Sequence, residues 1–95
     1  MTTRIGIYPG AFDPITFGHL DIMKRSLKIV DKIIIGVADN INKKSLLSID
    51  DRKKLILSDI TTYLETNADI SVEAISGLLT DYAKKNKVTC IIRGL

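Results

Sequence analysis

The sequence has no tryptophan, one cysteine and one histidine. A single cysteine excludes an intrachain disulfide and any metal site built from several cysteines. Because Cys90 lies in the apolar run from Val88 to Ile92, we expect a packed thiol, in keeping with a reducing cytoplasm. No apolar stretch approaches the roughly 20 residues of a membrane span, and no secretory apolar region follows Met1. We therefore expect a cytoplasmic protein with no membrane partner.

The excess of positive charge is small. Lys and Arg together number 14 against 11 Asp and Glu, which gives a formal net charge of +3. This excess is too mild to indicate nucleic-acid binding, and no basic run is interleaved with aromatic side chains. It suits a small polyanionic ligand and suits solubility equally well, so charge alone does not separate these two interpretations.

Four short apolar runs rich in β-branched residues have the length and composition of strands. They are Ile5 to Tyr8, Ile33 to Val37, Ile70 to Ile75 and Val88 to Ile92. The continuous runs are typical of strands covered on both faces, as in a parallel sheet. The polar stretch from Asp39 to Ser48 is the longest loop between the predicted elements.

Three segments between these runs, 18–30, 49–64 and 78–87, carry apolar residues at helical spacing. The apolar positions are Leu20, Met23, Leu27 and Val30, then Leu55, Ile56 and Ile60, and then Leu78, Leu79, Tyr82 and Ala83. Ser48 is a candidate cap for the second helix, with Asp50 and Asp51 in its first turn. The order β-α-β-α-β-α-β predicts an α/β fold with a doubly wound parallel sheet and right-handed crossovers.

The predicted domain organisation is one unit over residues 1–95, because no internal repeat, low-complexity tract or linker divides the sequence. The sequence stops just after the fourth strand, whereas doubly wound sheets have about five strands or more. A fourth strand at the end of the chain would leave an open apolar edge. We therefore expect this chain to be the N-terminal portion of a longer protein.

The segment from Tyr8 to His19, after the first strand, has the features of a phosphate-binding loop. Gly10 permits a tight turn, Pro14 fixes the local geometry, and Gly18 removes a side chain where the helix starts. His19 falls in the first helical turn, where backbone N–H groups and the helix dipole favour a phosphate. Its imidazole can donate a hydrogen bond as charge shifts during group transfer. Each residue alone is also ordinary in a surface loop, and the combination favours a ligand site.

This loop, YPGAFDPITFGH over residues 8–19, resembles the signature of the nucleotidylyltransferase superfamily, which carries an (H/T)xGH motif. Thr16 in place of the first histidine makes it similar to the phosphopantetheine adenylyltransferase family. Three later stretches agree with that family: Asn42, Lys43 and Lys44 followed by Asp50, Asp51 and Arg52; GLLTDYA at 77–83; and IIRGL at 91–95. The resemblance covers essentially the whole chain in order and implies a Rossmann-like fold.

The resemblance implies transfer of an adenylyl group from ATP to phosphopantetheine, which gives dephospho-coenzyme A and pyrophosphate in coenzyme A biosynthesis. Such chemistry depends on positioning and charge stabilisation more than on a covalent nucleophile. The implied cofactor is Mg²⁺ carried by ATP, with no metal ligand set in the protein. The implied partners are ATP, phosphopantetheine and further copies of the chain, since the family is typically hexameric.

The resemblance also assigns roles to individual residues. His19 would contact the ATP phosphates and stabilise the transition state. The implied ATP-binding residues are Ala11, Phe12, Gly18, His19, Gly94 and Leu95. The implied acceptor-binding residues are Ala11, Lys43, Leu79 and Arg93. Lys43 and Arg93 would meet the acceptor phosphate, and Leu79 would lie against the pantetheine arm.

Arg93 stands out without the family as well. It directly follows an apolar strand, and an arginine there lies in the crevice beside the first loop if strands one and four are neighbours. Lys43, by contrast, lies in a polar loop where a solvated lysine is ordinary. Leu79 is part of an apolar helical stripe, where a core role is an alternative to ligand contact.

Two departures from the family pattern affect the expected activity. Position 11 is alanine, where the family has Thr or Ser whose hydroxyl meets the acceptor phosphate. Ala11 offers only its backbone N–H, so we expect weaker acceptor binding. The sequence also lacks the family's next arginine, a later acidic residue and a serine-rich ATP loop. We therefore expect little or no transferase activity from this chain by itself.

Two other functions stay open. One is cytidylyl transfer to a phosphorylated alcohol, which Thr16 disfavours because those enzymes carry histidine at this position. The other is a non-catalytic nucleotide-binding or assembly module, which the early ending of the sequence favours.

Overall fold

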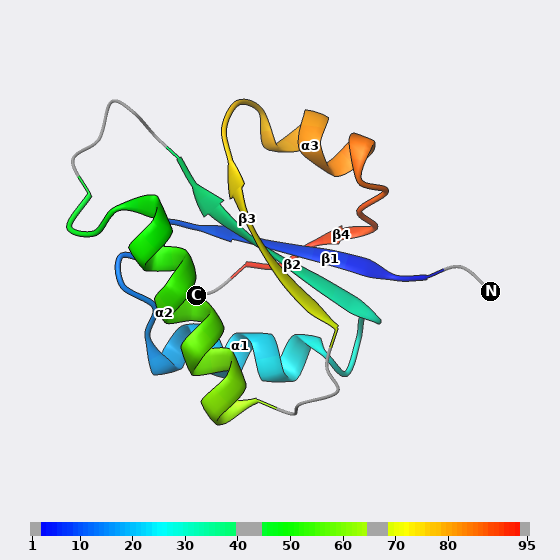
Figure 1. Ribbon diagram of the computed structural model, residues 1–95. Coiled ribbons are helices and arrows are strands. Elements are labelled where there is room, and N and C mark those ends of the chain that lie inside the picture. Colours follow the sequence, from blue (N-terminus) through cyan, green and yellow to red (C-terminus); the bar gives the residue numbers. More distant parts are fainter. Residues whose placement is uncertain (1–2, 40–44, 65–68, 94–95) are drawn as a thin grey trace.

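The chain forms a parallel sheet with helices on both faces (Figure 1). The computed structural model describes residues 3–39, 45–64 and 69–93. The elements in chain order are β1 (Ile5–Gly10), α1 (Phe17–Ser26), β2 (Lys32–Ala38), α2 (Ile49–Tyr63), β3 (Ile70–Ile75), α3 (Leu79–Lys85) and β4 (Cys90–Ile91). Figure 1 shows α1 and α2 on one side of the sheet and α3 on the other. The predicted order of strands and helices is confirmed.

The strands lie in the order β3-β2-β1-β4, and every neighbouring pair is parallel. Ile7 of β1 therefore lies between Ile34 of β2 and Ile91 of β4. The first and fourth strands are neighbours, which is the condition on which the placement of Arg93 rests. Because all four strands run the same way, the loops that follow them lie along one edge of the sheet, where ligands bind in folds of this kind.

The core lies between β1, β2 and the two helices on their shared face. In β2, Ile33 and Ile35 are fully buried. From α1, Leu20 and Met23 close over them, as their helical spacing predicts. The other buried side chains of the same cluster are Tyr8, Phe12, Ile15, Val30, Val37, Ile56 and Leu64.

The helices begin close to where the sequence predicts, but they end earlier than predicted. Ser48 caps α2 as predicted, since its Oγ accepts a hydrogen bond from the Asp51 N–H at 3.1 Å. The first helix ends at Ser26 and not at Val30, because residues 27–29 form a turn that leads into β2. Within that turn the Lys28 N–H donates to the Arg25 carbonyl oxygen, three residues back.

Two expectations about burial were wrong. Leu55 was placed on the inner stripe of α2, but it is 42% exposed, and the core contact is made by Ile56. Cys90 was expected to be packed, but its side chain is exposed. The reason is its position: β4 has only β1 as a neighbour in the described sheet, and it pairs over two residues, where five were predicted.

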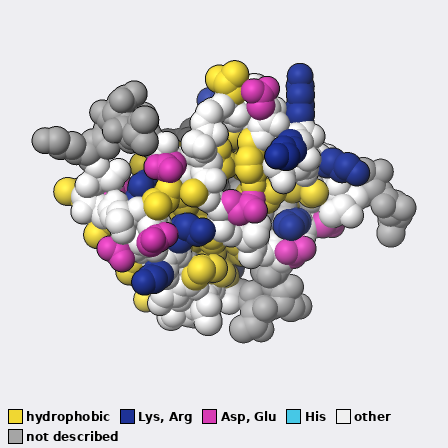
Figure 2. Space-filling view, turned by 45° about the horizontal axis from the view of Figure 1, so that its top comes forward, with side chains coloured by type: hydrophobic (Ala, Val, Ile, Leu, Met, Phe, Trp, Pro, Cys, Tyr) yellow, Lys and Arg dark blue, Asp and Glu magenta, His cyan; other side chains and the backbone are white. Residues whose placement is uncertain are grey.

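The face of the molecule that carries α3 is thinly packed. Figure 2 shows hydrophobic side chains reaching the surface between charged ones on this side. None of the residues in α3 is buried, and Leu78 just before it is 68% exposed. In the described parts of the chain, no helix has both the length and the apolar character that a membrane crossing requires.

Candidate functional site

The loop after β1 is shaped by Gly10 and Phe12. Phe12 has a φ of 48°, in the left-handed region that residues with side chains rarely adopt, and its ring is buried. A Cβ on Gly10 would come within 3.1 Å of that ring, which is tighter than ordinary van der Waals contact. Glycine at position 10 therefore lets the loop fold its aromatic side chain inward.

His19 packs against two aromatic rings from β1 and its loop. The centroid of its imidazole lies 4.8 Å from that of Phe12 and 6.1 Å from that of Tyr8. The Tyr8 and Phe12 rings themselves meet edge to face at 5.3 Å. Both aromatic rings are buried, so they hold the imidazole from one side with little freedom to rotate.

The hydrogen bonds of His19 define its tautomer. The Thr16 backbone N–H donates to Nδ1 at 2.9 Å, and the His19 N–H in turn faces the Thr16 Oγ1 at 3.4 Å, which forms a reciprocal cap on α1. Since Nδ1 accepts a hydrogen bond, the proton of the neutral ring lies on Nε2. Burial lowers the pKa of His19 below its usual 6.5, which favours the neutral ring at pH 7. His19 is thus a fixed, neutral Nε2–H donor.

A cavity of about 350 Å³ opens at this histidine. Its lining comes from the end of β1, the loop and the first turns of α1: Tyr8, Pro9, Gly10, Phe12, Thr16, Gly18, His19 and Ile22. The first turn of α1 contains no acidic residue. Its free backbone N–H groups and the positive end of the helix dipole therefore favour an anion in this cavity.

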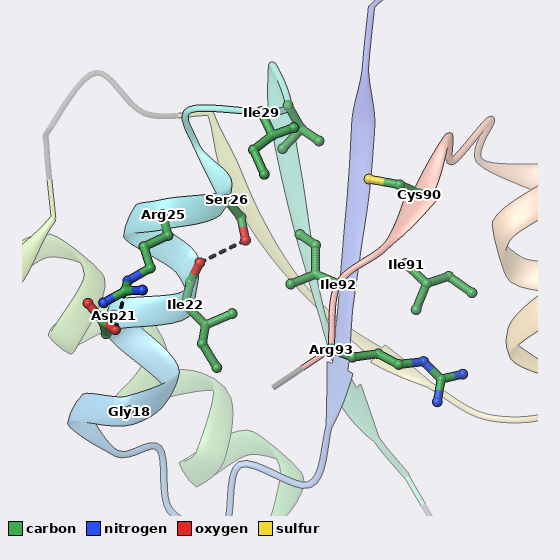
Figure 3. A pocket seen from close by; sticks show the side chains of 11 residues that line it. Gly18, Asp21, Ile22, Arg25, Ser26, Ile29, Cys90, Ile91, Ile92 and Arg93 are labelled. Atoms are coloured by element: carbon green, nitrogen blue, oxygen red, sulfur yellow. Dashed lines mark hydrogen bonds and ion pairs between the residues drawn. The ribbon is translucent and has the colours of Figure 1, made fainter. Parts of the chain in front are cut away.

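A larger cavity, about 720 Å³, lies between α1 and β4 (Figure 3). Its lining is mostly apolar and includes Ile22, Ile29 and Ile92, with the Arg25–Asp21 ion pair of α1 at its side. In Figure 3 Ile92 points toward α1, whereas Arg93 extends away from it. Gly18 lines both cavities, so the two spaces meet at the start of α1.

The structure brings together some of the predicted site residues and separates others. Phe12, Gly18 and His19 line the smaller cavity, and Arg93 shares the larger one with Gly18. Ala11 is exposed on the loop beside them. Leu79 is the first residue of α3, after the carboxyl end of β3 and outside both linings. The remaining predicted residues, Lys43, Gly94 and Leu95, lie outside the described residues.

Sequence reasoning missed two residues that fasten the loop. Arg52 of α2 is only 4% exposed and donates to the carbonyl oxygens of Ala11 at 2.9 Å and Ala38 at 3.2 Å. The Asp13 carboxylate accepts from the backbone N–H groups of Leu46 at 2.6 Å and Leu47 at 2.8 Å. The available signal was the helical spacing, since Arg52 lies four residues before the buried Ile56 and hence on the inner face of α2.

These features define a class: an α/β protein with a Rossmann-like parallel sheet and, between its first strand and first helix, a loop whose geometry suits an anion. The chain belongs to the Cytidylyltransferase-like family, whose sequence profile matches residues 7–95.

Curated relatives narrow the similarity further. The chain is 47% identical over 95 residues to a phosphopantetheine adenylyltransferase from Wolbachia sp. subsp. Brugia malayi, covering 100% of this chain and 55% of that protein. It is 48% identical over 92 residues to the protein of the same name from Alkaliphilus oremlandii, covering 97% of this chain and 56% of that protein. The chain therefore spans about half the length of the curated relatives it matches.

Solved structures share the fold. The nicotinic acid mononucleotide adenylyltransferase of Plasmodium falciparum, complexed with NaAD, matches 90% of this chain with 46% of its own, at a TM-score of 0.75 and 23% identity. A bifunctional NMN adenylyltransferase/ADP ribose pyrophosphatase from Francisella tularensis matches 90% of this chain with 25% of its own, at a TM-score of 0.67 and 22% identity. These likenesses confirm the predicted Rossmann-like sheet.

Proposed function

We propose that this chain supplies the nucleotide-binding loop of a phosphopantetheine adenylyltransferase, which transfers an adenylyl group from ATP to phosphopantetheine. The observation that carries the proposal is His19, a neutral Nε2–H donor fixed at the positive end of α1 beside an open cavity. The names of the relatives at 47% and 48% identity support the choice of acceptor.

The reaction needs stabilisation of charge more than a nucleophile from the protein. An oxygen of the acceptor phosphate attacks the α-phosphorus of ATP, a new P–O bond forms, and the bond to the β-phosphate oxygen breaks to release pyrophosphate. The attacking phosphate is already an anion, so no general base is required. His19 donates its Nε2–H to a phosphoryl oxygen of ATP, where negative charge shifts as the bonds exchange.

The geometry of α1 accounts for the glycine before this histidine. In the ligand-free chain, a Cβ on Gly18 would have only the Thr16 Oγ1 near it, at an ordinary 3.5 Å. Packing within the chain therefore does not require glycine at position 18. Close approach of a phosphate to the helix start does, because the backbone N–H groups there must reach the anion.

The acceptor site is proposed along the same edge of the sheet. Arg93 follows β4 on one side of β1, and the segment containing Lys43 follows β2 on the other. Leu79 follows β3 further along that edge, where it is assigned to the pantetheine arm. The two cations would hold the acceptor phosphate, and Ala11 would add only its backbone N–H.

Magnesium is proposed as an ion carried by the ATP phosphates, where it would supply positive charge against the leaving pyrophosphate. Within the described ranges, no three His, Cys, Asp or Glu side chains gather where they would hold a metal ion. A hexameric assembly and a cytoplasmic location accompany the proposal as expectations from the same family resemblance.

Isothermal titration of the chain with ATP, CTP and phosphopantetheine tests this function. Binding of ATP and phosphopantetheine, with CTP much weaker, is the expected result. Preference for CTP would replace it with cytidylyl transfer. Nucleotide binding without acceptor binding would make the chain a nucleotide-binding module.

A further inference from the structure

Arg52 is a buried cation with an unusual set of partners. The residue is only 4% exposed, and its guanidinium contacts the loop after β1. Its hydrogen bonds among the described residues all go to backbone carbonyl oxygens: Ala11 at 2.9 Å, Ala38 at 3.2 Å and Ser48 at 3.4 Å. No described acidic side chain lies within ion-pair distance of it. The positive charge under the loop is therefore not cancelled by a carboxylate in the described parts of the chain.

We propose that Arg52 is a positioning residue, which fixes the Ala11–Phe12 peptide so that the Phe12 N–H is presented to the nucleotide phosphates. This inference rests on the proposed function for the identity of the anion. The orientation of the peptide is independent of the proposed function, because it follows from hydrogen bonds within the chain.

The Ala11–Phe12 peptide has a fixed geometry. The bond between Ala11 and Phe12 is trans, so its C=O and N–H point in opposite directions. Because the carbonyl oxygen of Ala11 accepts from the Arg52 Nη1, the Phe12 N–H points away from α2. Phe12 also lines the cavity that contains His19. The arginine contact on one side of the peptide thus fixes a donor on the other.

The backbone conformation of Phe12 also requires support from its neighbours. Phe12 keeps a φ of 48°, which a phenylalanine does not adopt without contacts that hold it there. Its ring packs against the imidazole of His19 and occupies the space that a side chain at Gly10 would take. Its peptide is held by Arg52, whose guanidinium also reaches the end of β2 at Ala38. The strained residue is therefore fixed from both its side chain and its backbone.

The positive charge of Arg52 acts on the same peptide. A guanidinium that donates to a carbonyl oxygen polarises the peptide and strengthens its N–H as a donor. A buried cation without a carboxylate partner also favours an anion nearby, because that anion would supply the missing negative charge. Both effects favour a phosphate at the Phe12 N–H, next to the Nε2–H of His19.

Two substitutions at this position separate charge from geometry. Arg52→Met removes the donors and keeps an unbranched side chain that fills the buried space. Arg52→Lys keeps the charge and loses the planar fork that reaches two carbonyl oxygens. Ile56→Val is the matched control, because Ile56 is buried on the same helix and lies one turn further from the loop.

The φ-dependent NMR coupling of Phe12 and the affinity for ATP are measured for each variant, together with the thermal unfolding midpoint. We expect Arg52→Met to abolish the positive φ of Phe12 and to weaken ATP binding about tenfold or more. Arg52→Lys should fall between it and the wild type, so it keeps the test open if Arg52→Met does not fold. Ile56→Val should lower the unfolding midpoint with the Phe12 coupling and ATP affinity unchanged.

An unchanged Phe12 coupling in a folded Arg52 variant overturns the positioning role. An equal loss of ATP affinity in Ile56→Val also overturns it, since the effect would then follow stability alone. A wild-type chain that binds no ATP contradicts the proposed function instead, and the Phe12 coupling in the ligand-free variants then decides whether Arg52 positions the peptide.

Discussion

The two halves of this chain are built with different density. In the half formed by β1, α1, β2 and α2, both strands are largely buried, and the loop after β1 is held by Arg52 of α2 and by its own Asp13. In the half formed by α3 and β4, no helical residue is buried and the strand pairs over two residues only. The site residues with fixed geometry, Phe12 and His19, belong to the dense half. Leu79 and Arg93, which are proposed to bind the acceptor, belong to the thin half.

The difference indicates a division of labour within the proposed reaction. Charge stabilisation requires donors that are held in place before the reaction begins, and a dense core provides this. Acceptor binding tolerates looser support, since long flexible side chains such as arginine adjust to a phosphate.

Truncation of a core residue should distinguish the halves most strongly. Ile35→Ala in β2 removes a fully buried side chain and should lower the free energy of unfolding by about 2–5 kcal/mol. Ile91→Ala in β4, which is 40% exposed, should cost less than about 1 kcal/mol. Urea unfolding measures both. Equal losses would show that β4 is as well packed as β2 in solution.

Removal of the His19 side chain should have the second-largest effect. His19→Ala deletes the Nε2–H donor and half of the reciprocal cap with Thr16, so ATP binding should weaken about tenfold. Leu78→Ala, at an exposed position of the thin half, is the control and should leave ATP affinity unchanged. Titration calorimetry checks both variants. ATP affinity that survives His19→Ala would remove this residue from the site.

Gly18→Ala should separate stability from binding. The added methyl meets only ordinary contacts, and alanine favours a helix more than glycine does, so the unfolding midpoint should stay equal or rise. ATP binding should weaken several-fold, because the methyl occupies space at the helix start. Gly10→Ala is the contrasting variant, since its methyl meets the Phe12 ring and should lower stability as well. Unimpaired ATP binding by Gly18→Ala would place the nucleotide elsewhere.

The pH dependence of stability should show the smallest effect. The pKa of His19 is lowered in the folded chain, so the unfolded chain takes up a proton first as the pH falls through 6.5. The contribution is therefore fully present above pH 6.5 and is lost as the pH falls toward the folded-state pKa. His19 is the only histidine in the sequence, so His19→Gln should abolish this slope in urea unfolding between pH 7 and about 5.5. A slope that persists in the variant would assign it to another group.

The apolar periodicity of the sequence predicted most of the fold. It did not predict the hydrogen bonds that hold the loop after β1 in place. Apolar spacing located Leu20 and Met23 in the core, and the Ser48 side chain marked the start of α2. The contact of Arg52 with Ala11 joins residues 41 positions apart, and no local pattern specifies which carbonyl oxygen a buried arginine will reach. The burial of Cys90 was wrong because it depends on what covers a strand and not on the strand's own composition.

The site itself was predicted in part. The position of His19 in the first turn of α1 is confirmed, and the condition for the placement of Arg93, that β1 and β4 are neighbours, is met. The tautomer of His19 required the Thr16 N–H, which a motif of residue types does not contain. The roles of the individual residues in binding stay predictions, including those of Lys43 and the terminal Gly94 and Leu95.

The carboxylate of Asp13 has a consequence beyond the loop that contains it. By accepting from the N–H groups of both Leu46 and Leu47, it joins the segment after β1 to the segment before α2. Two segments joined in this way have fewer conformations to lose when a ligand bridges them, so part of the entropic cost of binding is met when the chain folds. Preorganisation of this kind favours a ligand that contacts both segments at once.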